Sequence, residues 1–283
     1  MRDKKYHFWA FQLILLLIFS GQGAYADKRE IYVGVGLSRF NYEEYDDNQA
    51  FLDGESGLLP GILFKLKNTR PGSFYELVAG LYSSKIDYDG QTQTHIPLKT
   101  KSHATIFDGH FKMATKLERK SYLYGGAGYR YWWRNIYPGQ TQTGTPVSGV
   151  LEDYFWPYLL LGYQANLYEK KNIEVGLDVR LTHMLSARMN IDFLGYCGYD
   201  NTHFDLGNRN GWRFAVPFKI KSASVSTFLV TPYYEIIDIG KSNSVSLTRN
   251  GALVDCDSNG YYDGALEPRS ETRNLGIELT WLW

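Results

Sequence analysis

The sequence predicts an all-β fold, a transmembrane antiparallel up-and-down β-barrel of about ten strands. Three observations predict it. Apolar and polar residues alternate with a period of two in many segments, and the connections between these segments are alternately short and long. No segment beyond the N-terminus holds the roughly 18 consecutive apolar residues of a membrane helix. Charge is balanced at 30 basic and 30 acidic residues, and no nucleic-acid partner is expected.

The N-terminus predicts a secretory signal peptide over residues 1–26. Three of the first five residues are basic, an apolar run covers residues 8–19, and Ala24 and Ala26 supply the small residues of a cleavage site. The apolar run is about a dozen residues, too short for a membrane-spanning helix. Excluding the signal leaves one predicted domain, a barrel over residues 27–283.

The alternation is clearest from residue 173 to 181, where Ile, Val and Leu at odd positions alternate with Glu, Gly, Asp and Arg at even positions. Successive side chains of a strand point to opposite faces, so such a strand fits a wall between lipid and a polar lumen. Four prolines inside the predicted strands, at 60, 157, 217 and 232, each remove a ladder donor and indicate a bulge or a displaced boundary. The predicted strands lie near residues 30–41, 57–67, 73–87, 100–114, 121–134, 153–168, 172–186, 210–221, 224–238 and 271–283.

Connections of two lengths join these strands. Short periplasmic turns and long extracellular loops produce this alternation in outer-membrane barrels, and an even strand number places both termini in the periplasm. The short connections are 68–72, 115–120, 169–171 and 221–223. The long connections are 42–56, 88–99, 135–152, 187–209 and 239–270.

The pentapeptide Gly-Gln-Thr-Gln-Thr occurs twice, at residues 90–94 and 139–143, and a proline follows each copy at the same distance. A fixed spacing of this kind indicates a duplicated hairpin that kept a good turn sequence. The alternative is that the amide and hydroxyl side chains form a surface that binds sugars, such as those of lipopolysaccharide.

The last predicted strand has an apolar face that ends on an aromatic residue. That face consists of Leu275, Ile277, Leu279, Trp281 and Trp283, opposite a mostly polar or small face. The strand resembles the closing strand of Gram-negative outer-membrane β-barrel proteins, whose terminal aromatic residue is read by the assembly machinery. The resemblance implies a monomeric barrel in the outer membrane, surrounded by membrane lipid and lipopolysaccharide. Candidates for its outer aromatic girdle are Trp132, Trp133, Tyr154, Phe155 and Trp156.

Ionisable residues of both signs lie on the predicted inward faces. A barrel of about ten strands is only slightly wider than one filled by its side chains, and unpaired buried charge is costly. We therefore expect opposite charges to pair and plug the lumen, with a narrow channel for small solutes as the alternative. The inward set is Lys65, Glu76, Asp108, His110, Lys112, Arg130, Glu174, Asp178, Arg180, Arg213, Lys219, Glu235 and Glu278.

Two cysteines, Cys197 and Cys256, fall in neighbouring long connections, and an oxidising compartment favours a disulfide between them. Around Cys256 the sequence matches the beginning of an EF-hand-type Ca²⁺ loop, with a glycine at its sixth position. It departs from that motif at the twelfth position, where Leu266 stands in place of glutamate, so a solvated acidic turn is the alternative. The candidate ligands are Asp255, Asp257, Asn259, Tyr261 and Asp263.

The chain bears a partial resemblance to omptin proteases, ten-stranded barrels in which an Asp pair faces an Asp–His pair across the mouth. Asp87 and Asp89 end the third predicted strand, and Asp200 and His203 lie in the fourth long connection. The Asp-x-x-His spacing departs from the Asp-x-His of the family. We therefore expect a non-enzymatic surface protein, structural or binding, that acts through its long extracellular loops. A narrow channel and an omptin-like hydrolase are the alternatives.

Overall fold

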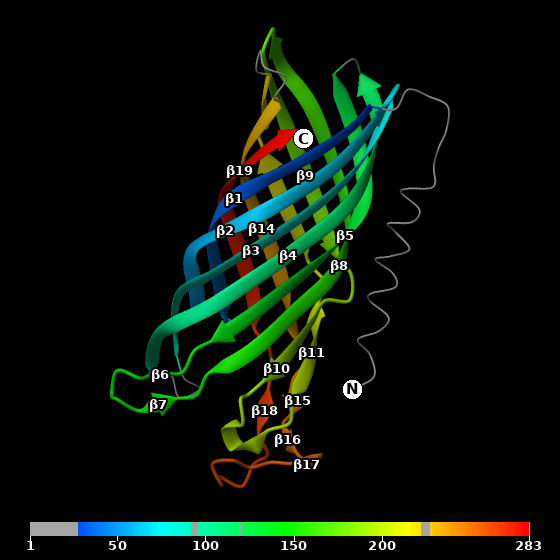
Figure 1. Cartoon of the computed structure of the whole chain (residues 1–283). Coiled ribbons are helices and arrows are strands. Elements are labelled where there is room, and N and C mark those ends of the chain that lie inside the picture. The colour runs from blue at the N-terminus through cyan, green and yellow to red at the C-terminus, as the bar shows by residue number, and fades with distance from the viewer. Residues whose placement is uncertain (1–27, 92–95, 119, 222–226, 283) are drawn as a thin grey trace.

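In the part of the chain that the structure describes, ten antiparallel strand positions form the wall of a closed barrel (Figure 1). The computed structural model describes residues 28–91, 96–118, 120–221 and 227–282, so the predicted signal peptide lies outside it. The wall closes because β1 pairs with β2 on one side and with β19 on the other. The wall strands are β1 (Lys28–Tyr45), β2 (Phe51–Arg70), β3 (Ser73–Gln91), β4 (Pro97–Glu118), β5 (Ser121–Ile136), β8 (Val150–Lys170), β9 (Ile173–Met184), β10 (Arg188–Asp192), β11 (Thr202–Gly207), β12 (Asn210–Ala215), β13 (Phe218–Lys221), β14 (Thr227–Ser242) and β19 (Arg269–Leu282). The predicted barrel of about ten strands is confirmed.

Two wall positions are built from more than one strand. β9 and β10 both pair with β8, and the chain between them bulges opposite Pro157, whose carbonyl accepts the N–H of Leu185 at 2.8 Å. Ser186 has a positive φ of 50° in this bulge. β11, β12 and β13 make up the next position, and the ladder breaks at Pro217, which has no N–H to donate. The missing N–H of Pro217 therefore explains the break between β12 and β13.

The wall extends further than predicted at the end with the long connections, which points down in Figure 1. β10 and β11 lie inside the predicted connection 187–209, and β14 and β19 enter the predicted connection 239–270. Residues 193–201 and 243–268 remain outside the wall. The small elements here are β6 (Gly139–Gln140), β7 (Pro146–Val147), the 3₁₀ turn η1 (Tyr196–Gly198), β15 (Val245–Ser246), β16 (Thr248–Arg249), β17 (Ala252–Leu253) and β18 (Gly264–Ala265).

The two copies of the repeated pentapeptide lie on neighbouring connections. The second copy begins with β6 and continues through Thr141, which forms a β-bridge with Leu98 at the start of β4. The first copy begins at the end of β3, and its last three residues lie outside the described part of the chain. The bridge therefore joins the second copy to the strand that follows the first.

An apolar belt surrounds the outer face of the barrel. On β1 the outward Val35 and Leu37 are exposed, while the inward Tyr32 and Phe40 are buried, as the period of two requires. About 9–11 residues of a tilted strand cross a membrane, so strands of 18 to 22 residues such as β1 to β4 project beyond the belt. The described residues contain no helix that is long and apolar enough to span a membrane. Other belt members are Leu58, Ile62, Phe64, Leu81, Leu159, Leu161, Trp212, Phe214, Tyr234, Leu275, Ile277 and Leu279.

An aromatic plug fills the barrel interior on the long-connection side of the belt. The Trp132 ring lies 5.5 Å from Phe40, 5.0 Å from Tyr42 and 4.8 Å from Tyr154, all measured between ring centroids. Trp132, Tyr154 and the neighbouring Trp156 are buried inside the barrel, so their assignment to the outer girdle is wrong. They share the inward face of their strands, and only Trp133 and Phe155 of the five candidates alternate to the outside.

Candidate functional site

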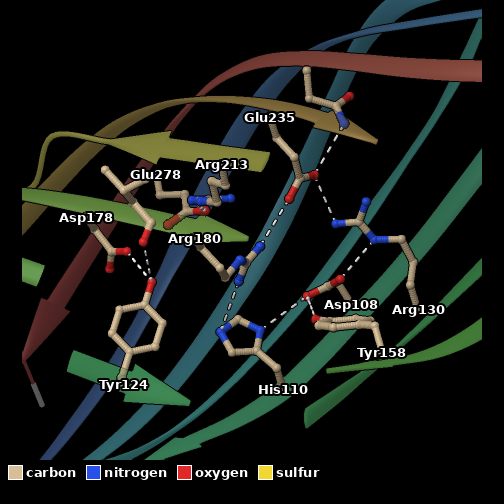
Figure 2. A network of polar contacts seen from close by, with 12 residues as sticks. Asp108, His110, Tyr124, Arg130, Tyr158, Asp178, Arg180, Arg213, Glu235 and Glu278 are labelled. Carbon is tan, nitrogen blue, oxygen red and sulfur yellow. Dashed lines mark hydrogen bonds and ion pairs between the residues drawn. The ribbon is translucent and has the colours of Figure 1, made fainter. Parts of the chain in front are cut away.

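A network of ionisable side chains crosses the middle of the lumen (Figure 2). Asp108 on β4 and Arg130 on β5 are cross-strand neighbours, and 2.8 Å separates Asp108 Oδ2 from Arg130 Nε. From β14, Glu235 accepts hydrogen bonds from Arg130 at 3.0 Å and from Arg180 at 3.1 Å. The residues defined here as the mid-lumen network are Asp108, His110, Arg130, Arg180, Arg213, Glu235 and Glu278.

The remaining contacts complete the charge balance of the mid-lumen network. Arg213 pairs with Glu278 at 2.5 Å. His110 lies between two partners, with Nδ1 3.3 Å from Asp108 Oδ1 and Nε2 3.3 Å from Arg180 Nη1. A neutral imidazole with its proton on Nδ1 satisfies both, because it donates to the carboxylate and accepts from the guanidinium. Three carboxylates thus face three guanidiniums.

Toward the short turns, a cavity of about 820 Å³ lies in the lumen. Lys112 in its wall pairs with Glu76 at 2.9 Å and lies 3.6 Å from Asp178. Lys219 lies 3.6 Å from Glu30 on the same wall. A smaller space of about 120 Å³ lies at the mid-lumen network. The cavity therefore narrows where the guanidiniums and carboxylates meet.

All thirteen residues of the predicted inward set line one or both of these spaces. Seven of them form the mid-lumen network, and the other six face the wider cavity. Ion pairs cross the lumen, as the expected plug requires. The aromatic plug on the long-connection side is a second barrier, which the pattern of charges alone did not indicate.

A second group of ionisable side chains lies beyond the aromatic plug, under the long connections. Its centre is Arg134 on β5, which is 1% exposed. The Arg134 guanidinium lies 2.7 Å from Glu152, 2.9 Å from Glu55, 3.1 Å from Glu44 and 3.6 Å from Asp53. With Glu267, described next, these residues form what we define as the mouth cluster: Glu44, Asp53, Glu55, Arg134, Glu152 and Glu267.

Glu267 joins the mouth cluster through two tyrosine hydroxyls. Tyr154 donates to Glu267 Oε1 at 2.6 Å, and Tyr42 lies 3.2 Å from the same oxygen and 2.7 Å from Glu44 Oε1. Glu267 precedes β19, so it belongs to a long connection, whereas the other members belong to the wall. The mouth cluster therefore holds five carboxyl groups around a single guanidinium.

The mouth cluster lies outside the membrane-spanning part of the wall. At the same height along the barrel, the outer face of β3 and β4 carries the ion pairs Asp87–Lys101 and Asp89–Lys99 instead of apolar residues. Burial, together with the negative charge of Glu44, raises the pKa of Asp53, Glu152 and Glu267 above their ordinary values. The protein environment therefore favours the protonated form of these three carboxyls.

The mouth cluster is absent from the predicted inward set because the predicted strands stop short of it. Glu44, Glu55 and Glu152 fall in predicted connections that the structure shows to be wall. Arg134 is the last residue of a predicted strand, two inward positions beyond Arg130, so the alternation within that strand already placed it on the inward face. Glu267 lies in an irregular segment, where no periodic signal exists.

The connections 193–201 and 243–268, together defined as the head, are cross-linked. A disulfide joins Cys197 to Cys256, with 5.9 Å between their Cα atoms. The Tyr199 hydroxyl donates to Asp263 at 2.7 Å, which is a second link between the same two connections. The predicted disulfide is thus present, and it clamps a structure that extends beyond the barrel mouth (Figure 1).

Asp200 supplies a third link within the head. Its carboxylate accepts the backbone N–H groups of Gly251 at 2.9 Å and Asn250 at 3.0 Å, and the hydroxyl of Thr248 at 2.7 Å. These hydrogen bonds, that from Gly251 first, lower the pKa of Asp200. Asp200 therefore acts as an anchor for the turn between β16 and β17.

The candidate calcium ligands lie together in one exposed turn of the head. Asp255 accepts the N–H of Gly260 at 2.8 Å, and Asp263 accepts the N–H of Cys256 at 2.8 Å. Within the described ranges, no group of three or more His, Cys, Asp and Glu side chains is placed to hold a metal ion. The carboxylates of this turn bond to its own backbone, and Tyr261 projects outward.

The residues that resemble the omptin site do not converge. Asp87 and Asp89 point outward from β3 and pair with lysines, because Tyr88 between them faces inward. His203 is exposed on β11, which is not a neighbour of β3 in the wall. Asp200 is occupied as the anchor of the head. The four residues therefore form no common site across the mouth.

The apolar face of the closing strand lies on the outside of the barrel. Leu275, Ile277 and Leu279 are exposed on β19, and Trp281 is partly buried on the same face. Trp283 lies outside the described residues. This face is part of the apolar belt.

No protein-family model and no curated protein matches the chain. Among solved structures, the outer membrane protease OmpT from Escherichia coli matches with a TM-score of 0.51 and 12% identity, over 91% of this chain and 96% of OmpT. The toluene transporter TodX from Pseudomonas putida matches at 8% identity and a TM-score of 0.36, over 90% of this chain and 89% of TodX. A FadL homologue from Pseudomonas aeruginosa matches at 9% identity and a TM-score of 0.33, over 90% of each chain. The likeness to OmpT shows the fold, which is that of an outer-membrane β-barrel.

Proposed function

We propose that this chain is a non-enzymatic surface protein of the outer membrane that binds an extracellular partner through its head. The observation that carries the proposal is a cross-linked head that exposes tyrosines: Tyr261 is 79% exposed, Tyr262 67% and Tyr196 54%. Tyrosine rings supply large contact areas at a low cost in conformational entropy, and exposed apolar patches mark interaction sites. The disulfide and the Asp200 anchor limit the entropy that the head would lose on binding.

In this proposal the head faces the exterior, and the short turns and both termini face the periplasm. The asymmetry between short and long connections supports this orientation. The barrel is a monomer in membrane lipid and lipopolysaccharide, and the outward apolar face of β19 is the part that the assembly machinery would read. Labelling of a cysteine introduced at Tyr262 on intact cells tests the orientation, because only an external head is accessible.

A narrow channel is the second candidate, and the cavity of about 820 Å³ supports it. A solute would have to pass both the mid-lumen network and the aromatic plug. Conductance of the refolded protein in a planar bilayer separates the two candidates. We expect no steady conductance, and reproducible single-channel currents would favour the channel.

An omptin-like surface hydrolase is supported by the likeness to OmpT in fold. The outward positions of Asp87, Asp89 and His203 weigh against it. Incubation of the refolded protein with a mixed peptide library tests the idea. Cleavage that is lost in Asp87→Ala or His203→Ala would replace the binding proposal with a hydrolase.

Binding itself is tested with arrays of glycans and extracellular proteins, probed with the refolded protein in detergent. The double variant Tyr261→Ser/Tyr262→Ser is expected to weaken any binding at least tenfold, about 1.4 kcal/mol. The control is Tyr168→Ser, an exposed tyrosine near the short-turn end of β8, which is expected to bind normally. Equal weakening by both variants, or binding that survives the double variant, would contradict a role for the head.

A further inference from the structure

The charges of the mouth cluster do not balance. Arg134 contacts four of the five carboxyls within 4 Å, and no cation of the described residues lies that close to Glu267. Glu55 is 1% exposed and Glu267 5%, so water does not solvate them as it would at the surface. Five carboxylates, four of them buried and Asp53 partly buried, would leave four uncompensated negative charges beside a single guanidinium, and burying each is costly.

Hydrogen bonding also favours protonation of the mouth cluster. Asp53 Oδ1 and Glu55 Oε2 are buried atoms without a hydrogen-bond partner among the described residues. A proton on either oxygen converts it into a donor that a neighbouring carboxylate can accept. Protons therefore supply both the missing charge and the missing donors.

The mouth cluster connects the head to the wall through Glu267. Its side chain accepts from Tyr154, and its backbone N–H donates to Ser242 Oγ at 2.8 Å. The Ser242 N–H in turn donates to the Glu267 carbonyl at 2.9 Å. Glu267 is the one head residue in the mouth cluster, and its side chain and backbone both hydrogen-bond to residues of the wall.

We propose that the mouth cluster is a proton-operated latch, which holds the connection 243–268 on the barrel mouth while its carboxyls share protons and releases it as the pH rises. The latch does not depend on what the head binds. It would allow solution pH to change the mobility of the head without any change in the barrel wall. The titratable and charged groups that face it are Tyr42 and Glu44 from β1, Asp53 and Glu55 from β2, Tyr88 from β3, Arg134 from β5, and Glu152 and Tyr154 from β8.

The direction of the pH effect follows from linkage. Asp53, Glu152 and Glu267 have a raised pKa when the mouth is closed, so they hold protons more tightly closed than open. Their contribution to closure is complete below their ordinary values, 3.8 for Asp and 4.5 for Glu, and decreases as the pH rises toward the raised pKa. Each proton released on opening changes the ratio of open to closed molecules about tenfold per pH unit in that range.

The test measures distances between two spin labels in the full refolded chain with its disulfide intact. The labels are placed on cysteines introduced at the exposed Ser246 of the head and the exposed Lys99 of the wall. At pH 5 we expect one narrow distance distribution. Between pH 5 and pH 9 we expect a longer and broader population, with the open-to-closed ratio rising at least about tenfold.

Glu267→Gln is the decisive variant, because its amide oxygen still accepts from Tyr154 but cannot ionise. It is expected to keep the narrow distance at pH 9. The matched control is Asp257→Asn, an exposed carboxylate of the same connection whose hydrogen bonds go to Asn259, and it is expected to open like the parent chain. Distances that do not change with pH, or a Glu267→Gln variant that opens like its parent, would overturn the latch. Opening by a chelator at pH 5 would also overturn it, because a metal ion and not protons would then hold the mouth cluster.

Discussion

The mid-lumen network and the mouth cluster use the same residue types in different proportions. In the mid-lumen network three carboxylates meet three guanidiniums, whereas in the mouth cluster five carboxyls surround Arg134. Both are buried inside the same wall, on inward positions of strands such as β5, where Trp132 lies between Arg130 and Arg134. Burial alone therefore does not make a group of charges sensitive to pH. Equal numbers of opposite charges stabilise each other without extra protons, whereas an excess of carboxylates needs bound protons to neutralise it.

The largest expected effect is the loss of Arg134. Arg134→Leu leaves the mouth cluster without its cation, and we expect a loss of stability at the upper end of about 3–5 kcal/mol. The measurement is the urea midpoint of the mobility shift between folded and unfolded barrel on a gel. Arg213→Leu is the comparison, because it leaves only Glu278 without its direct ion-pair partner. An equal loss in both variants would mean that charge balance does not distinguish the two sites.

The aromatic plug separates these two sites, and its loss is the next largest effect. Trp132→Ala removes a ring that packs against Phe40, Tyr42 and Tyr154, and we expect a cost of about 3–4 kcal/mol from the cavity. We also expect the variant to remain non-conducting, because the mid-lumen network still crosses the lumen. Trp133→Ala, on the outer face, is the control and should cost much less. Currents through Trp132→Ala alone would show that the plug is the main barrier.

Removal of the disulfide should affect only the region outside the wall. Cys197→Ser/Cys256→Ser opens a constraint between residues 59 apart in sequence, and we expect about 2–4 kcal/mol of lost stability in the head. Limited proteolysis should then cut within residues 243–268 while the barrel keeps its folded mobility on a gel. A lower unfolding midpoint of the barrel itself would show that head and wall form one cooperative unit.

The smallest expected effect has a pH dependence opposite to that of the latch. The lowered pKa of Asp200 means that its contribution to the head is present above the ordinary value of 3.8 and is lost as the pH falls toward and below the lowered pKa. The N–H groups of Asn250 and Gly251 should therefore lose protection against hydrogen exchange in acid, after correction for intrinsic rates. Asp200→Asn should show weak protection at every pH. Acid-sensitive protection that persists in Asp200→Asn would assign the effect to another carboxyl.

The barrel and its polar lining could be predicted because they depend on a local property. The alternation with a period of two appears in the sequence of each strand. The inward positions of residues such as Arg130 and Glu235 therefore follow from whether their residue numbers are odd or even within the strand. The same is true of the apolar belt and of the alternating connection lengths. The disulfide between Cys197 and Cys256 followed from an oxidising compartment and two cysteines in neighbouring connections.

Tertiary structure decided the height of the wall, the role of the large aromatic residues and the composition of the mouth cluster. Trp132 and Tyr154 suit a membrane girdle by composition, and only closure of the barrel shows that they meet inside it. Glu44 and Arg134 lie 90 residues apart, and Glu267 reaches Tyr42 over a separation of 225. Parity states which face a side chain occupies, but strand tilt and closure determine which distant side chains meet across the lumen. The balance of positive and negative charges where distant strands meet is therefore a property of the folded barrel, and it cannot be read from any single strand.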